Sequence, residues 1–239
     1  MKQWQLIAGA VALSLAAGTV IVFGHRLFGP APATDSAQAD RTGIPLPWQI
    51  TAHPDGSSQA LGLTLGTDTG GSTLGDARQR FGVDTQIAII AAPGEDGTLE
   101  AFVDPAQAGF IAGKLVITAE LPAATLRAMR ERAPKAEFME STTRKYRLHP
   151  DDEAQALRAR IVALSFIPQA GLDADIVLAR FGQPAQRVRS NGHLEHFLYP
   201  ERGLDVILDT EGKELLQYVA PRNFQRLRAP LLAASAAAN

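Results

Sequence analysis

The sequence predicts an α+β fold made of two tandem helix-plus-antiparallel-sheet units behind an N-terminal transmembrane helix. Three observations support this prediction. The chain begins with a long uncharged apolar run, three short landmarks recur in the same order further along, and helical and strand-like patterns alternate around those landmarks. The composition, with 46% hydrophobic and 20% charged residues among 239, is that of a globular protein.

Residues 1–28 are predicted to form a signal-anchor. Residues 6–23 carry no charged side chain, and their number approaches the ~20 apolar residues that a membrane-spanning helix needs. A cleaved signal peptide is the alternative, because residues 31–33 and 37–39 have the Ala-x-Ala pattern of a signal-peptidase site. Either way the long domain that follows is translocated. We expect a single-pass inner-membrane protein with an inside amino terminus and its C-terminal domain in the periplasm.

Residues 29–43 are rich in Pro, Ala, Ser and Thr without apolar periodicity, so we expect a flexible linker. Beyond it the landmarks recur at separations of 100, 95 and 99 residues. Ordered matches of this kind indicate a duplicated unit. We expect a first unit at 44–134, a connecting strand and helix at 135–164, a second unit at 165–228 and a disordered tail at 229–239. The matched landmarks are Arg80-Phe81-Gly82 with Arg180-Phe181-Gly182, Leu99-Glu100-x-Phe102 with Leu194-Glu195-x-Phe197, and Gly113-Lys114 with Gly212-Lys213.

In the first unit, Thr73 is the expected N-cap of a helix that has Asp76 at its third position and ends at Gly82. Turn residues 93–97 then predict a hairpin. The expected strands are 86–92, 98–103 and 114–121, and Pro122 precedes the next helix.

The second unit repeats this pattern, with Asp173 as the expected cap and Gly182 as the helix end. Its expected strands are 186–189, 193–199, 204–208 and 214–219. In the connecting segment, residues 137–148 alternate like a strand. Acidic residues from Asp151 then open a helix whose expected apolar positions are Ala154, Leu157, Ile161 and Leu164. The two Gly-Lys pairs are expected to sit at equivalent turns and to serve the scaffold.

No catalytic, cofactor-binding or metal-ligating residue is predicted. The glycine-rich loop 66–73 has Ser72 where a phosphate-binding loop needs Lys, and Leu74 breaks the G-x-S-x-G pattern. His193 and His196 are three residues apart on an expected strand, so their side chains would face opposite sides of the sheet. No histidine has an evident Ser or Asp partner in the sequence, so no catalytic triad is proposed.

Composition narrows the classes of partner. The chain has 23 Lys and Arg against 25 Asp and Glu, which gives no electrostatic footprint for nucleic acid. It has no cysteine, which excludes disulfides, thiolate chemistry and lipidation through a Cys. We expect no nucleic acid and no cofactor among its ligands.

Two stretches resemble the BamE/SmpA-OmlA family of small envelope proteins: GLTLGTDTGGSTLGDARQRFG at 62–82, and LSFIPQAGLDADIVLARFGQPAQR at 164–187 followed by HFLYPERGLDVILD at 196–209. The tandem arrangement also resembles the duplicated units of β-lactamase inhibitory protein. These resemblances imply a capped helix followed by a hairpin-rich sheet in each copy, and a tendency to bind other proteins.

Together these observations predict a membrane-anchored periplasmic module that binds another envelope protein or acts as a scaffold, without catalysis. It would contact the inner membrane through residues 6–23. The alternative is an envelope enzyme, a carboxylate-based hydrolase with a cleft between the two units. Two carboxylates with raised pKa facing one pocket would favour that alternative.

Overall fold

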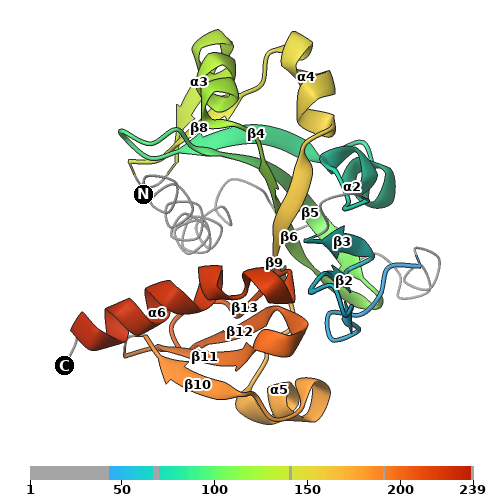
Figure 1. Ribbon diagram of the computed structural model, residues 1–239, viewed down its shortest axis with the longest axis vertical. Helices are drawn as coiled ribbons and strands as arrows, with labels where there is room; N and C mark the ends of the chain where they lie inside the picture. Colours follow the sequence, from blue (N-terminus) through green and yellow to red (C-terminus); the bar gives the residue numbers. More distant parts are fainter. Residues whose placement is uncertain (1–42, 67–69, 140–141, 191, 238–239) are drawn as a thin grey trace.

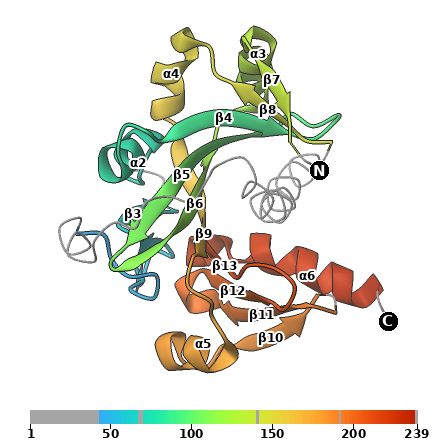
Figure 2. The same cartoon turned by 180° about the vertical axis from the view of Figure 1, so that it is seen from behind.

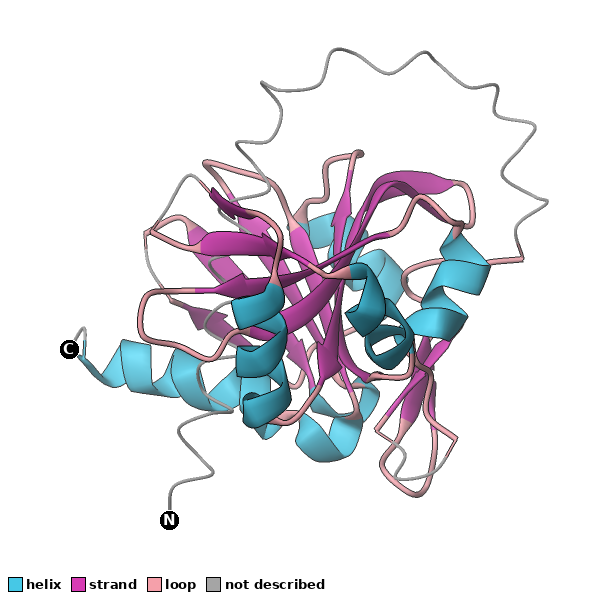
Figure 3. Ribbon diagram, turned by 90° about the horizontal axis from the view of Figure 1, so that it is seen from above, coloured by secondary structure: helices cyan, strands magenta, loops and turns pink. Residues whose placement is uncertain are grey.

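A computed structural model describes residues 43–66, 70–139, 142–190 and 192–237. Its main feature is one ten-stranded antiparallel sheet, accompanied by a three-stranded sheet. Strands cross the middle of the molecule and helices lie around them (Figure 3). The expected transmembrane segment, residues 6–23, lies outside the described residues. Within the described part, no helix is both long and apolar enough to cross a membrane.

The order of strands in the large sheet is β10-β11-β12-β13-β9-β6-β5-β4-β8-β7, and every neighbouring pair is antiparallel. The strands are β4 Gln86–Ala91, β5 Thr98–Ala108, β6 Ile111–Glu120, β7 Ala136–Phe138, β8 Arg144–Arg147, β9 Arg160–Pro168, β10 Gln186–Arg189, β11 Leu194–Tyr199, β12 Leu204–Asp209 and β13 Leu215–Val219. The small sheet has the order β1-β2-β3, with β1 Thr51–Ala52, β2 Ser58–Ala60 and β3 Leu63–Leu65.

This topology corrects the predicted fold class. The prediction of two tandem helix-plus-antiparallel-sheet units is wrong, because β9 pairs with β6 on one side and with β13 on the other. Both expected units therefore belong to one continuous sheet (Figure 1). Strand β9 was not expected from the sequence, and neither were the three strands of the small sheet. The helix begun at Asp151 ends at Leu157, and Ile161 and Leu164 lie in β9.

The helices are α2 Leu74–Phe81, α3 Ala123–Arg132, α4 Pro150–Leu157, α5 Ala174–Phe181 and α6 Gln225–Ala237. The expected caps of α2 are confirmed: the Thr73 hydroxyl accepts from the backbone N–H of Asp76, and the Asp76 side chain accepts from that of Thr73. At α5 the Asp173 carboxylate accepts from the backbone N–H of Ile176, without a reciprocal side-chain bond, and both helices end at a glycine. Helix α6 runs through most of the expected tail, and its Leu231 is buried.

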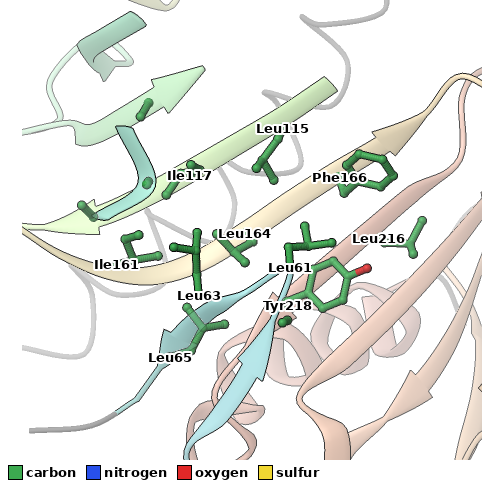
Figure 4. Packing of buried hydrophobic residues seen from close by; sticks show 14 of the residues in the cluster. Leu61, Leu63, Leu65, Leu115, Ile117, Ile161, Leu164, Phe166, Leu216 and Tyr218 are labelled. Atoms are coloured by element: carbon green, nitrogen blue, oxygen red, sulfur yellow. The ribbon is translucent and has the colours of Figure 1, made fainter. Parts of the chain in front are cut away.

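One face of the large sheet, the core face, carries the main hydrophobic core. Leu115 and Leu216 both lie opposite Phe166 of β9, one on each side, so the core crosses from one half of the sheet to the other. The small sheet packs its leucines onto this face (Figure 4). These leucines are Leu61, Leu63 and Leu65, each at most 1% exposed.

The other face, called here the second face, has a separate cover. Helix α6 packs Leu227 and Leu231 onto Leu198 and Val219. Among the described residues, every buried polar side chain within the strands of the large sheet lies on this face, as the alternation of side chains along each strand shows. They are Thr98, Glu100, Thr118, Ser165, His196, Asp205 and Gln217.

Candidate binding groove

A cavity of about 490 Å³ opens on the second face where the two halves of the sheet meet. Its floor is formed by β5, β6, β9 and β13, and α6 and the start of α3 supply walls. In Figures 1 and 2, α3 and α6 lie on opposite sides of this region. The volume falls within the range of small-ligand pockets, about 300–1,000 Å³. We call this cavity the groove.

The groove combines apolar walls with a polar floor. Its floor includes four neutral hydrogen-bonding side chains on adjacent strands: Thr98, Thr118, Ser165 and Gln217. Ser165 of β9 lies opposite Gln217 of β13, so these two side chains come from the two halves of the sheet. The apolar walls are Leu121, Pro122, Leu126 and Leu227. A mostly apolar hollow with a few convergent polar groups is the usual composition of a binding site.

Glu100 lies directly beside the groove floor. It is opposite Thr118 on the neighbouring strand, and the Thr98 hydroxyl donates to its Oε1 at 2.9 Å. Its side chain is buried, and burial raises the pKa of Glu100 to about 7, although the hydrogen bond from Thr98 acts in the opposite direction. At neutral pH this carboxyl group is therefore close to the midpoint between its protonated and ionised forms.

The rims of the groove carry opposite charges. Asp96 and Glu120 line it on the side of the β4–β5 turn and the end of β6, and Arg226 lines it from α6. Asp96 also forms an ion pair of 3.5 Å with Arg127. A ligand lying across the floor would therefore pass from an acidic rim to a basic one.

A second polar array lies further along the same face. The Ser190 hydroxyl is 3.0 Å from Nε2 of His196, and Nδ1 of His196 is 2.8 Å from Oδ2 of Asp205. No Ser or Asp partner of a histidine was evident in the sequence, and strand pairing supplies both for His196 from residues that are separated along the chain. The order of hydrogen bonds is that of a Ser-His-Asp triad.

The surroundings of this array favour a structural role. The side chains of His196 and Asp205 are each 1% exposed, and neither lines the groove. Burial raises the pKa of Asp205, while the hydrogen bond from His196 lowers it. Its Oδ1 atom has no hydrogen-bond partner among the described residues. The array connects β11 and β12 with Ser190, the residue that follows β10, and its His196 and Asp205 are buried.

The two histidines singled out in the sequence bind different carboxylates. Nδ1 of His193 is 2.8 Å from Oδ1 of Asp209, whereas His196 contacts Asp205. In the described part of the chain, no three His, Cys, Asp or Glu side chains are placed to hold a metal ion together. Of the glycine-rich loop, residues 67–69 lie outside the described residues. Ser72 accepts from the backbone N–H of Thr64, so its hydroxyl fixes the loop to β3.

The carboxylates with raised pKa are not brought together. Glu100 lies on β5 and Asp205 on β12, four strands apart in the sheet order. At about 4.8 Å per strand this is about 19 Å, beyond the separation that two-carboxylate hydrolysis uses. Within the described residues, Glu100 and Asp205 therefore do not form the pair of carboxylates facing one pocket that would favour a hydrolase.

The sequence analysis did not find the groove or Glu100. The groove depends on β9, whose residues Ile161 and Leu164 were expected in a helix. The sequence did contain a signal for the polar floor. Thr98, Glu100 and Thr118 alternate with apolar residues, and polar side chains are unusual on a sheet face that is buried. Comparisons of the chain with protein-family models, with curated proteins and with solved structures gave no match.

Proposed function

We propose that the protein is a membrane-anchored binding module of the cell envelope, without catalysis, and that it holds a segment of another envelope protein in the groove. The observation that carries this proposal is the groove itself, with an apolar wall on each side and hydrogen-bonding side chains across its floor. The predicted apolar segment 6–23 would attach the module to the inner membrane, with residues 44–239 in the periplasm.

The chemistry of the groove suits an apolar segment with a polar backbone. Leucine and proline walls would bury apolar side chains, at about 25 cal/mol per Å² of surface removed from water. Thr118, Ser165 and Gln217 could satisfy backbone N–H and C=O groups that a bound segment would otherwise leave without partners. The oppositely charged rims would fix the direction of the segment.

Site-specific photo-crosslinking in intact cells tests this proposal. A photo-reactive amino acid is placed at Arg226, on the groove wall, and in a separate variant at Val83, which is 85% exposed and outside the groove. We expect a discrete adduct with one envelope protein from position 226 and none of that mass from position 83.

A cavity-filling change supplies the matched control. Ser165→Tyr places a large side chain on the groove floor, and Val83→Tyr adds the same side chain on the exposed surface. The adduct from position 226 should disappear with Ser165→Tyr and persist with Val83→Tyr, while thermal melts show that both variants fold. An adduct that survives Ser165→Tyr in a folded protein would contradict binding in the groove.

A further inference from the structure

The turn between β5 and β6 carries the exposed Phe110, which lies beside the half-buried Trp48. Phe110 is 67% exposed, and its ring lies edge-on to the half-buried Trp48 ring at a centroid distance of 6.3 Å. Leu46 packs closely against Gly109, where an added Cβ would lie 2.5 Å from its Cδ2 atom. We call Leu46, Trp48 and Phe110 the aromatic tip. Single exposed apolar residues are common on protein surfaces, but neighbouring ones mark contact sites.

The aromatic tip lies where the chain enters the fold. The backbone N–H of Gly109 donates to the carbonyl of Ile44 at 3.0 Å, so the first described residues are fixed to this turn. The Tyr218 hydroxyl donates to the Pro47 carbonyl at 3.0 Å from the core of the sheet. The tip is therefore a rigid part of the fold.

Residues 24–43 separate the aromatic tip from the predicted anchor at 6–23. If the expected linker behaves as a random coil, a chain of that length has a root-mean-square span of about 25 Å. The tip is therefore held close to any bilayer in which residues 6–23 are embedded. Figures 1 and 2 place the turn that carries Phe110 beside the small sheet, away from α6.

The chemistry of the tip matches the boundary between lipid and water. The exposed Arg180 places its guanidinium 4.9 Å from the centre of the Trp48 ring. Tryptophan is enriched at the headgroup level of membranes, where its ring is partly apolar and partly polar. Arginine binds phosphate groups through charge-assisted hydrogen bonds.

We propose that the aromatic tip docks on the headgroup layer of the membrane that carries the anchor, with Trp48 and Phe110 among the lipid carbonyls and Arg180 at the phosphates. This inference rests on the anchoring part of the proposed function. Docking would fix the orientation of the folded domain above the bilayer instead of leaving it free on its linker.

Tryptophan fluorescence can test the proposal directly, because the chain has two tryptophans, Trp4 and Trp48. Trp4→Phe leaves Trp48 as the sole tryptophan in the full-length chain. The protein is reconstituted into phosphatidylethanolamine and phosphatidylglycerol vesicles whose acyl chains carry bromine, a short-range quencher. We expect at least twofold quenching of Trp48, stronger with bromine near the carbonyl end of the acyl chain than near its methyl end.

Two exposed phenylalanines provide a matched pair. Phe110→Ser should reduce the quenching by at least half, whereas Phe138→Ser, which changes a residue 70% exposed on β7, should leave it unchanged. Equal quenching in both variants would overturn the role of the tip. Trp48 fluorescence that is the same in brominated and ordinary vesicles would overturn docking, including the case in which the tip binds a protein instead.

Flotation of the same vesicles after an alkaline wash separates this inference from the proposed function. A chain that floats without quenching of Trp48 is anchored but not docked, so only the docking fails. A chain that does not float refutes the anchor. That result also overturns docking as proposed, because the proposal places the tip on the membrane that carries the anchor.

Discussion

The two Leu-Glu-x-Phe segments occupy corresponding strands in the two halves of the molecule, yet they face in opposite directions. Leu99 of β5 is in the core and Glu100 is on the second face, whereas Phe197 of β11 is in the core and His196 is on the second face. A shift of one residue in a strand reverses the side on which each residue lies. Identical residues at the same spacing therefore do not lie in equivalent environments in the two strands.

The contrast is sharpest at the two glutamates. Glu100 is buried, and the Thr98 hydroxyl donates to it, while Glu195 forms an ion pair of 3.0 Å with Arg187 at the sheet edge. One carboxyl group lies beside a groove and the other is part of an exposed ion pair. The halves therefore share an architecture of helix and hairpin without sharing a functional surface.

The largest difference we expect concerns the phenylalanines that end α2 and α5. Phe181 is 2% exposed and its ring lies 6.1 Å from Tyr199 and 6.4 Å from Trp48. Phe81 is only half-buried. Phe181→Ala should reduce the free energy of unfolding by about 3–5 kcal/mol, and Phe81→Ala by about 1–2 kcal/mol. Denaturant unfolding of the two variants measures both values. Equal losses would contradict the expectation that the different burial of the two rings sets their contributions to stability.

The next prediction concerns the pH dependence of stability, which we expect Glu100 to cause and Glu195 not to cause. Glu100 has a pKa of about 7 in the folded state against an ordinary value of 4.5, so the folded protein binds more protons than the unfolded chain between these values. Its contribution to stability is fully present below pH 4.5 and is lost as pH rises through 7. The difference corresponds to about 3 kcal/mol. Glu100→Gln should match the wild type near pH 4 and exceed it in stability by up to that amount at pH 8.

Urea unfolding at both pH values measures this difference, with Glu195→Gln as the control. That change removes the ion pair with Arg187, which is worth about 0–1 kcal/mol at an exposed site. The loss of stability between pH 4 and 8 that Glu100 causes should persist in the control. If Glu100→Gln retains the same pH-dependent loss as the wild type, Glu100 does not have the raised pKa.

The smallest effect distinguishes the two lysines of the repeated Gly-Lys pairs. Lys114 lies within β6 and forms an ion pair of 3.1 Å with Asp104, whereas Lys213 is exposed between β12 and β13. We expect Lys114→Ala to cost about 0.5–1 kcal/mol and Lys213→Ala less than about 0.5 kcal/mol. Thermal melts compare them. A larger loss of stability in Lys213→Ala than in Lys114→Ala would contradict this ranking of the two lysines.

The expectation that the two Gly-Lys pairs lie at equivalent turns is also wrong. Gly113 lies opposite Pro168 in the middle of the sheet, where an added Cβ would meet the Ile167 carbonyl oxygen at 2.5 Å. Gly212 lies between strands instead. A close approach of backbones and a turn can both require glycine, so the residue type alone does not distinguish them.

Local chemistry made several elements predictable. The Thr73 and Asp173 caps and the glycines that end α2 and α5 are decided within a few residues, and the structure confirms them. Strand β9 was not predictable in this way, because it is buried on both sides and carries no simple alternation of polar and apolar residues. Its apolar spacing also fits a helix continued from α4, so only pairing with distant strands decides it.

The candidate site depends wholly on such distant pairing. Thr118 and Gln217 are almost a hundred positions apart in sequence and reach the same groove because β6 and β13 flank β9. The Ser190, His196 and Asp205 array likewise requires the register of three strands. No local motif contains this information.

The central position of β9 affects the order in which the protein can be assembled during synthesis. Residues 86–120 can form their hairpins as soon as they emerge, but one edge of β6 stays unpaired until residues 160–168 follow. An open strand edge is a template for pairing with other chains. A nascent chain stalled before residue 160 is therefore exposed to aggregation, and a chaperone that shields β6 would act on that intermediate.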